Sequence, residues 1–247
     1  MGKVRADQLL VERELAPSRA KAQALIMAGV VYVGDRRVEK PGDLLPEGTA
    51  LDVRGEDHPY VSRGGVKLAG ALDRFGVDPR SLVCLDVGAS TGGFTDVLLQ
   101  RGATKVFAVD VGYGQLHEKI RKDPRVVVME RTNARVLTIE ALGFSAPAID
   151  LVVVDASFIG LEKLLPAIAA VTRPGGALVA LVKPQFQVKK GEVGKGGIVR
   201  DDALRLRASA EVAAEATRLG FEVRGEDDCV LPGPDGNRER FLWATRR

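Results

Sequence analysis

From about Ser62 onward, short apolar runs alternate with segments of helical character, and this alternation constrains the fold most. The runs are bounded by glycine or aspartate and are apolar throughout, as expected of parallel strands that are buried on both faces. The predicted strands are Leu82–Val87, Lys105–Val109, Arg125–Met129, Ile149–Val154 and Ala177–Val182. The predicted helices between and after them include Thr95–Arg101, Leu161–Val171 and Ala203–Leu219. The pattern predicts a doubly wound α/β sheet of the Rossmann-like kind.

The last two predicted strands are connected differently from the others. Apolar runs near Phe221–Val230 and Arg240–Thr245 are separated by the turn-forming residues Leu231–Asn237. So short a connection joins antiparallel neighbours rather than parallel ones. We therefore expect one antiparallel edge strand in the sheet.

The first 57 residues follow another pattern, which predicts a separate small α+β unit. Leu9, Leu10 and Leu15 have helical spacing, Pro17 interrupts the helix, and Ser18 is a good N-cap for a second helix. That helix is predicted over Arg19–Ala28, with Gly29 closing it. Short strands are predicted at Val30–Val33, Arg36–Val38 and Ala50–Val53, with a turn at Gly34–Asp35 and a linker at Gly55–Tyr60. The expected domains are residues 1–57 and 58–247.

Composition excludes several classes of protein. With 45% apolar and 28% charged side chains, the 247 residues are typical of a globular chain. Only two histidines and two cysteines occur, so a structural zinc site is not expected. No apolar run approaches the roughly 18 residues that span a bilayer, and the N-terminus lacks a signal-peptide core. A monomeric cytoplasmic protein without metal or membrane is expected. The net charge of +3 permits a nucleic-acid partner without arguing for one.

The first predicted strand leads into a glycine-rich loop and a helix start, Leu82–Phe94. Gly88 permits a tight turn, and Gly92 with Gly93 lets a ligand approach the backbone. The helix N-terminus offers free amide donors to a carboxylate or phosphate. Asp110 follows the second strand, where an acidic side chain can accept hydrogen bonds from both hydroxyls of a ribose. The segment therefore predicts a nucleoside-containing ligand.

Four interpretations of this loop compete. A loop that only turns the chain leaves Asp110 unexplained. A dinucleotide dehydrogenase favours glycine where this chain has Ser90. A hydrolase is suggested because residues 88–92 fit the G-x-S-x-G nucleophile elbow, but His117 lies in the second βα unit rather than near the C-terminus. Asp86, two residues before the first glycine, together with Asp110 favours S-adenosylmethionine.

Four charged residues are predicted to lie beyond the carboxyl ends of the strands, where parallel sheets place their sites. Asp155 ends the fourth strand, Lys183 ends the fifth, Glu239 begins the last, and Lys67 lies in the helix before the first. Each alone would be an ordinary surface charge. Together they suit methyl transfer to a ribose hydroxyl, a weak acid that must be aligned with the methyl group and lose its proton. A desolvated lysine can hold or deprotonate that oxygen, and carboxylates can orient the lysines.

These motifs resemble those of the TlyA family, bacterial ribosomal RNA 2′-O-methyltransferases once called haemolysins, whose catalytic half is similar to FtsJ-type enzymes. The matching stretches are Tyr60–Leu68, Asp86–Thr95, Val109–Leu116, Asp155–Phe158, Val182–Phe186 and Gly236–Glu239. The resemblance implies a catalytic tetrad of Lys67, Asp155, Lys183 and Glu239. It implies S-adenosylmethionine contacts from Asp86, Gly88, Ser90, Thr91, Gly92, Phe94, Asp110, Asn133 and Asp155, with Asn133 beside the adenine.

The first unit resembles the small RNA-binding domain of ribosomal protein S-four and of several pseudouridine synthases. The matching stretches are Arg5–Leu10, Ser18–Ile26 and Gly29–Asp35. The residues expected to contact RNA are Arg5, Arg19, Lys21, Arg36, Arg37 and Lys40, with Arg63 from the second unit. Tyr32 is the single aromatic residue in this unit, which favours recognition of folded RNA by shape. A basic glycine-rich loop at Lys189–Arg200 is expected to be mobile and to close over the RNA.

The sequence therefore predicts an S-adenosylmethionine-dependent methyltransferase that acts on the ribose of ribosomal RNA, alone or in ribosomal subunits. The family suggests cytidine as the target nucleotide. A non-catalytic ribosome-binding assembly factor is one alternative, disfavoured because the tetrad and the glycine loop occur together. A membrane-acting cytolysin is another, and no membrane-inserting segment supports it.

Overall fold

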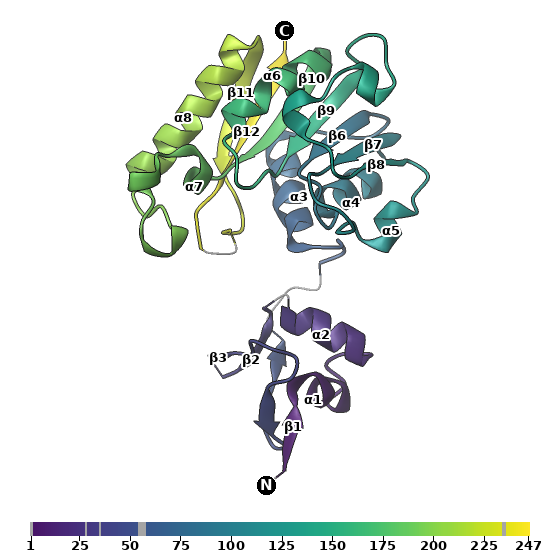
Figure 1. Cartoon of the computed structure of the whole chain (residues 1–247), viewed down its shortest axis with the longest axis vertical. Helices are drawn as coiled ribbons and strands as arrows, with labels where there is room; N and C mark the ends of the chain where they lie inside the picture. The colour runs from purple at the N-terminus through teal and green to yellow at the C-terminus, as the bar shows by residue number, and fades with distance from the viewer. Residues whose placement is uncertain (1, 28, 35, 54–57, 234–235) are drawn as a thin grey trace. The chain divides into compact units, whose positions relative to one another are not determined.

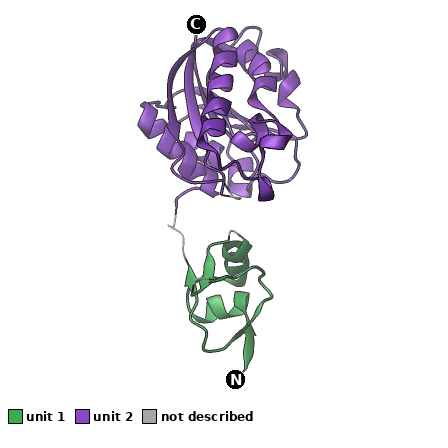
Figure 2. Ribbon diagram, turned by 90° about the vertical axis from the view of Figure 1, so that its left-hand side faces the viewer, with its two compact units in different colours: residues 1–57 green, residues 58–247 purple. Residues whose placement is uncertain are grey.

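The computed structural model describes residues 2–27, 29–34, 36–53, 58–233 and 236–247. The chain forms two compact units, Met1–Asp57 and His58–Arg247, coloured separately in Figure 2. The division coincides with the change of sequence pattern after residue 57. Because each unit has its own hydrophobic core, each is described by itself.

The first unit combines two helices with two small antiparallel sheets. Strands β2, β3 and β5 form one sheet in the order β3-β2-β5, and β1 pairs with β4 in the other. Its elements are β1 (Lys3–Arg5), α1 (Ala6–Glu12), α2 (Arg19–Met27), β2 (Val31–Val33), β3 (Arg36–Arg37), β4 (Leu44–Pro46) and β5 (Asp52–Val53). Residues from both helices and from β2 meet in one core, which includes Leu10, Ile26 and Val31. The α+β prediction is confirmed, although β1 and β4 were not predicted.

Helix α1 is shorter than predicted. It ends at Glu12, and Glu14, with a φ of 58°, turns the chain in the left-handed conformation that commonly closes helices. As a result Ala16 packs in the core and Leu15 is exposed, so the prediction that Leu15 belongs to the helix was wrong. Helix α2 begins where predicted, because the Ser18 hydroxyl accepts a hydrogen bond from the Lys21 amide. Ala28, Asp35 and residues 54–57 lie outside the described residues.

Asp7 is the central polar residue of the first unit. Its fully buried carboxylate accepts two hydrogen bonds from Arg5, both at 2.9 Å, one from Arg19 at 3.0 Å and one from Gln23 at 2.8 Å. The Arg5 guanidinium, opposed by burial, holds the pKa of Asp7 well below its usual range. One carboxylate thus ties the end of β1 to both helices.

The second unit is built on a seven-stranded sheet of order β11-β12-β10-β9-β6-β7-β8 (Figure 1). The strands are β6 (Val83–Val87), β7 (Lys105–Val109), β8 (Val126–Met129), β9 (Ile149–Val154), β10 (Thr172–Val182), β11 (Phe221–Asp228) and β12 (Arg240–Arg246). The α-helices are α3 (Arg63–Phe75), α4 (Gly93–Gln100), α5 (Glu118–Arg121), α6 (Leu165–Val171), α7 (Pro184–Gln187) and α8 (Asp202–Arg218). All seven predicted strands are present. Strand β10 begins at Thr172, five residues before the predicted start at Ala177, and the other ends shift by two residues at most.

Successive residues of the central strands face two different cores, as the period of a strand requires. Leu85 and Val152 belong to the core shared with α6 and α8, whereas Cys84 and Leu151 belong to the core shared with α3 and α4. The helices accordingly cover both faces of the sheet (Figure 1). The predicted Rossmann-like fold is confirmed. Among the described residues, no helix is long and apolar enough to cross a membrane.

The antiparallel edge of the sheet is a hairpin. Strand β12 pairs antiparallel with both β10 and β11, so the reversed strand lies second from the edge and β11 lies outside it. This order places the start of β12, and with it Glu239, at the same edge as the ends of the parallel strands.

Replacing Asp7 with alanine is expected to lower the free energy of unfolding of the first unit by about 1–3 kcal/mol, because Arg5, Arg19 and Gln23 lose the buried carboxylate that joins them. In the wild type, this stabilisation is present above the ordinary aspartate pKa of about 4 and declines as the pH falls toward the lower folded-state pKa. Hydrogen exchange of the α1 and α2 amides in the full chain measures both effects. Glu12→Gln, which changes an exposed carboxylate at the end of α1, is the control and should retain wild-type protection.

Candidate active site

Polar side chains gather where the central strands end, at one edge of the sheet. Asp110 directly follows β7, Asp155 follows β9 and Lys183 follows β10, while Glu239 precedes the reversed strand β12. Lys67 reaches this edge from α3, whose buried face packs against the sheet. The topology therefore brings together residues from five parts of the sequence, as expected for this class of sheet.

The glycine loop between β6 and α4 lies directly against the end of β9. Gly88 has a φ of 85°, and a Cβ atom at this position would lie 2.6 Å from the carbonyl oxygen of Asp155. Gly92 has a φ of 93° and is the N-cap of α4. Glycine is required at both positions, because L-residues rarely adopt this conformation and a side chain at Gly88 would collide with main chain.

Asp110 closes the other side of this loop. Its two carboxylate oxygens accept hydrogen bonds from the main-chain amides of Ser90, at 2.8 Å, and Gly112, at 2.7 Å. These bonds fix the orientation of the carboxylate and leave lone pairs on both oxygens for a ligand. The carboxylate therefore presents two oriented acceptors beside the loop.

Asp86 lies fully buried beneath the loop. One of its oxygens accepts a hydrogen bond from the Thr95 hydroxyl at 2.6 Å, and the other has no hydrogen-bond partner among the described residues. Burial raises the pKa of Asp86 to about 7, and the nearby carboxylates of Asp155 and Asp110 add to the shift. A cationic ligand beside this loop would offset the cost of the buried charge.

The other predicted ligand contacts occupy different environments around the loop. Ser90 and Thr91 are exposed in the loop, whereas Phe94 is buried in the first turn of α4 and packs against Phe241. Asn133 is exposed beyond β8, where its side chain caps a short helix by accepting from the Arg135 amide at 3.1 Å. The Asn133 side-chain NH₂ group can still donate to an adenine.

The four residues of the predicted tetrad form two lysine–carboxylate pairs. Lys67 Nζ donates to Glu239 Oε2 at 2.5 Å, and both side chains are almost completely buried. Lys183 Nζ lies 2.5 Å from Asp155 Oδ1, with 12% of the lysine side chain and 23% of the carboxylate exposed. Each buried ammonium group is therefore compensated by its own carboxylate, as burial of charge requires.

The two pairs and the loop lie within electrostatic reach of one another. The partly buried thiol of Cys229 is influenced by the charges of Lys67, Glu239 and Asp155, and Asp86 is influenced by Asp155. In the described part of the chain, no group of three or more His, Cys, Asp or Glu side chains could hold a metal ion. The contacts at this edge are lysine–carboxylate pairs beside the glycine loop.

The structure adds residues to which the sequence assigned no role. The Ser157 hydroxyl accepts a hydrogen bond from Lys183 Nζ at 2.9 Å. Phe158 is 92% exposed, and its ring contacts that of Phe186 with centroids 5.3 Å apart. The Gln115 side-chain oxygen accepts from the Ser90 hydroxyl at 3.3 Å. All four residues lie within the stretches that resemble the TlyA family. The sequence shows that they belong to motifs, but their contacts are visible only in the structure.

A hydrolase arrangement is not formed at the glycine loop. The Ser90 hydroxyl donates to Gln115, whereas His117 Nδ1 accepts a hydrogen bond from the Lys119 amide at 3.1 Å and caps α5. A nucleophilic serine requires hydrogen bonding to a base, and neither residue contributes to such a pair. The resemblance to a nucleophile elbow is therefore a coincidence of spacing.

The predicted RNA contacts are exposed basic residues, except for the half-buried Arg5, and several have partners within their own unit. Arg5 and Arg19 converge on Asp7, and Arg37 pairs with Glu39 at 3.1 Å. Lys21, Arg36 and Lys40 are exposed on the first unit. Arg63 is exposed in the first turn of α3 on the second unit.

The basic loop Lys189–Arg200 is held to the segment that precedes β12. The buried side chain of Asn237 accepts from the Val199 amide and donates to the Gly197 carbonyl, both at 2.9 Å. Glu192 adds an ion pair with Arg207 of α8 at 2.5 Å. The loop thus begins shortly after Lys183 and is pinned two residues before Glu239, next to the site.

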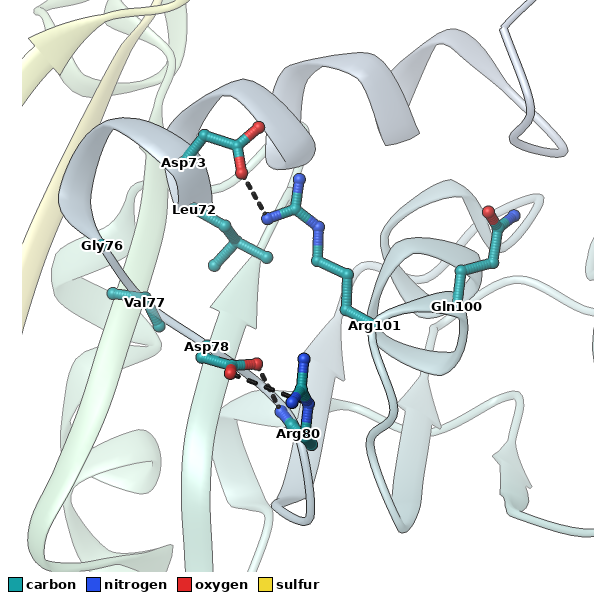
Figure 3. A pocket seen from close by; sticks show the side chains of 8 residues that line it. All are labelled: Leu72, Asp73, Gly76, Val77, Asp78, Arg80, Gln100 and Arg101. Carbon is teal, nitrogen blue, oxygen red and sulfur yellow. Dashed lines mark hydrogen bonds and ion pairs between the residues drawn. The ribbon is translucent and has the colours of Figure 1, made fainter.

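A cleft of about 560 Å³ lies away from this edge, beside the ends of α3 and α4 (Figure 3). It is lined by Leu72, Asp73, Gly76, Val77, Asp78, Arg80, Gln100 and Arg101. Arg101 is paired with Asp73 at 2.6 Å and Arg80 with Asp78 at 3.9 Å. The charged side chains of the cleft are paired with one another. The cleft also lies near the start of β6, whereas the site lies where the parallel strands end, so the cleft is not part of the site.

The fold and the site define the second unit as a methyltransferase domain. The FtsJ-like methyltransferase family matches residues 60–246, and the S4 domain family matches residues 4–51. The chain belongs to the TlyA family of FtsJ-like methyltransferases. Over 242 residues it is 50% identical to the 16S/23S rRNA (cytidine-2′-O)-methyltransferase TlyA of Mycobacterium tuberculosis, covering 98% of this chain and 89% of that protein.

Solved structures agree with this assignment. A hemolysin-named protein from Streptococcus thermophilus is 41% identical, with a TM-score of 0.78 over 100% of this chain and 89% of that chain. Magnesium protoporphyrin IX methyltransferase from Synechocystis, solved with bound S-adenosylhomocysteine, is 15% identical with a TM-score of 0.52 over 75% of this chain and 82% of that chain. The second likeness shows the fold alone.

Replacing Asp86 with asparagine is expected to change how stability depends on pH. The raised pKa means that the folded state favours the protonated acid, so in the ligand-free wild type this group's contribution to stability falls as the pH rises from about 4 to about 7. Between pH 5 and 8 the difference between wild type and variant should change by roughly 3 kcal/mol, since about two units of this range lie below the folded-state pKa of about 7 and one pKa unit corresponds to about 1.4 kcal/mol. Urea unfolding followed by Trp243 fluorescence between pH 5 and 8 measures it. Parallel curves for the two proteins would contradict the expectation.

Proposed function

We propose that this chain transfers a methyl group from S-adenosylmethionine to a ribose 2′-hydroxyl of ribosomal RNA. The observation that carries the proposal is the placement of two lysine–carboxylate pairs beside the ligand-binding glycine loop. The 50% identical relative from Mycobacterium tuberculosis is named as a cytidine-2′-O-methyltransferase of 16S and 23S rRNA. We therefore propose cytidine in ribosomal RNA as the target.

The residues around the loop suit S-adenosylmethionine. Asp86 carries a buried, unpaired carboxylate oxygen, which favours a cationic ligand nearby, and Asp110 offers oriented oxygens to ribose hydroxyls. The backbone at Gly88 and Gly92 leaves room that a side chain would fill. Ser90, Thr91, Phe94 and Asn133 would complete the binding surface. The bound cofactor supplies a sulfonium methyl group that is already electrophilic.

Lys183 is proposed to hold the 2′-hydroxyl and to take its proton. As the bond between oxygen and methyl carbon forms, the bond between that carbon and sulfur breaks, and S-adenosylhomocysteine is released. Lys183 first releases the proton of its resting ammonium to solvent. The hydroxyl proton then passes to the neutral amine, and Asp155 stabilises the ammonium that forms again. Lys67, held by Glu239, keeps a second positive charge beside the reacting oxygen.

The two units divide the work in this proposal. Residues 1–57 would bind folded RNA through Arg5, Arg19, Lys21, Arg36, Arg37 and Lys40, and residues 58–247 would catalyse the transfer. Arg19 donates to Asp7 through Nε. The two terminal nitrogens of the Arg19 guanidinium could therefore donate to RNA phosphates. Arg63 and the basic loop would contact the RNA near the site. The protein would act as a monomer in the cytoplasm, where ribosomes are made.

The exposed ring of Phe158 favours a nucleic-acid substrate. Together with Phe186, it forms an aromatic surface next to Asp155 and Lys183. Unstacked bases bind to such surfaces in RNA-binding proteins. A base resting there would bring its own ribose toward Lys183.

A non-catalytic ribosome-binding factor is the chief alternative, because the RNA-binding unit alone would suffice for it. Two buried lysine–carboxylate pairs are costly features that binding alone does not require. For the cytolysin alternative, which the hemolysin-named relative raises, release of dye from liposomes is the direct assay, and we expect none.

Methyl transfer itself is the decisive test. Labelled S-adenosylmethionine is incubated with ribosomal subunits and with naked ribosomal RNA from a strain that lacks the enzyme. Alkali-resistant label at a defined nucleotide is expected with the wild type, and none with Lys183→Ala or Lys67→Ala. Both variants should bind the cofactor in calorimetry nearly as the wild type does, because neither lysine belongs to the proposed cofactor contacts.

Lys122→Ala, which removes an exposed lysine of the α5 region, is the control and should transfer normally. No label on any RNA, despite measurable cofactor binding, would favour the binding-factor alternative. Loss of cofactor binding in both lysine variants would show that their roles are assigned wrongly.

Removing the charges of the basic loop should weaken RNA binding and leave cofactor binding unchanged. In a variant with Lys189, Lys190 and Lys195 replaced by alanine, the slope of log affinity against log salt should become shallower by about two, since each phosphate contact contributes about 0.7–0.9. Filter binding at several salt concentrations measures the slope. A variant with the same loss of charge at Lys105, Lys122 and Arg247 is the matched control, and equal slopes in both would contradict a specific role for the loop.

A further inference from the structure

The amine of Lys183 is held by two different kinds of contact. Asp155 Oδ1 lies 2.5 Å from Nζ as an ion-pair partner, and Ser157 Oγ accepts a hydrogen bond from Nζ at 2.9 Å. Only 12% of the lysine side chain is exposed, whereas Ser157 is exposed, so the ion pair is the more sheltered of the two contacts. The two contacts can therefore have different functions.

The carboxylate of Asp155 stabilises the charge of the Lys183 ammonium, whereas the hydroxyl of Ser157 constrains the orientation of its N–H bonds. An ion pair is attractive over a wide range of angles, because Coulomb energy depends on distance alone. A hydrogen bond to a hydroxyl requires alignment of the N–H bond with the acceptor. The nitrogen of a lysine has three positions besides its bond to carbon. With Ser157 and Asp155 occupying two sides, the third is left for the ribose oxygen.

The backbone around Ser157 is shaped to make this contact. Phe158 adopts a φ of 65°, a left-handed conformation that non-glycine residues rarely adopt. The turn begins at Asp155, whose amide donates to the Val87 carbonyl at 2.9 Å. It is closed by the contact between Phe158 and Phe186, three residues beyond Lys183. The turn that carries Ser157 is therefore held at its start by the hydrogen bond to Val87 and at its end by the ring contact with Phe186.

We propose that Ser157 is a positioning residue, whose hydroxyl fixes the rotation of the Lys183 amine so that its third position points at the ribose 2′-oxygen. The inference rests on the proposed methyl transfer. In the neutral amine, one N–H group is directed at Ser157, Asp155 remains beside the nitrogen, and the lone pair receives the proton from the 2′-hydroxyl. The oxygen electron pair freed by this transfer forms the bond to the methyl carbon, and the carbon–sulfur electron pair leaves with S-adenosylhomocysteine.

The test compares Ser157→Ala, which removes the acceptor, with Ser157→Thr, which keeps a hydroxyl. Single-turnover methyl transfer is measured at saturating cofactor and RNA from pH 6 to 9, together with cofactor affinity by calorimetry and RNA affinity by filter binding. Ser145→Ala, at an exposed serine of the β8–β9 connection, is the matched control. Thermal unfolding checks that each variant is folded.

With Ser157→Ala we expect a rate about tenfold lower, as loss of one hydrogen bond gives, with cofactor and RNA affinities within about twofold of the wild type. The acid limb of the pH–rate profile should move to lower pH, because a hydroxyl acceptor stabilises an ammonium more than a neutral amine. The titratable groups around this site are Asp155, Asp86, Asp110, Lys67, Glu239 and Cys229, and they are unchanged in the variant. Ser157→Thr should restore most of the rate.

A Ser157→Ala enzyme with the wild-type rate and pH profile would overturn the inference. So would a loss confined to RNA affinity, which would place Ser157 in the RNA interface. If the wild type methylates no RNA, the proposed function is wrong. If the wild type methylates RNA and Ser157→Ala does so equally well, only the inference about Ser157 is wrong.

Discussion

The close contact between Gly88 and the main chain of Asp155 joins the two halves of the site. Strands β6 and β9 are parallel neighbours, so the loop after one strand and the acid after the other leave the sheet side by side. The Asp155 amide donates to the Val87 carbonyl, and the absence of a side chain at Gly88 lets the loop lie against the Asp155 carbonyl. Any shift of this contact would separate the ligand-binding loop from Lys183 and its partners.

Charge compensation is the second constraint on the site. Lys67 with Glu239, and Lys183 with Asp155, bring cations and carboxylates into a region of low exposure, where each alone would be costly. Asp86 differs, because it is buried with one oxygen unpaired and has a raised pKa. The two lysine–carboxylate pairs compensate their own charges without a ligand, whereas a cation bound near Asp86 would compensate that carboxylate.

The first unit shows how one buried acid can organise a basic surface. Asp7 collects Arg5, Arg19 and Gln23 around one carboxylate and so restricts two arginine side chains that the sequence identified only as candidate phosphate contacts. If these two arginine side chains bind RNA, they would lose less conformational entropy on binding, because they are already restricted. The sequence could not predict this, because an aspartate beside an arginine is an ordinary exposed pair unless the tertiary structure buries it.

The sequence by itself determined the class of fold, the order of the strands along the chain, the reversal at the edge of the sheet and the family. These follow from local patterns: apolar runs of strand length, glycines where φ is positive and motifs such as Asp86–Thr95. Only the tertiary structure decided that Lys67 pairs with Glu239, that Ser157 contacts Lys183 and that Asn237 pins the basic loop. Lys67 and Glu239 are far apart in sequence, and which acid meets which lysine depends on strand register and helix rotation, which no local pattern encodes.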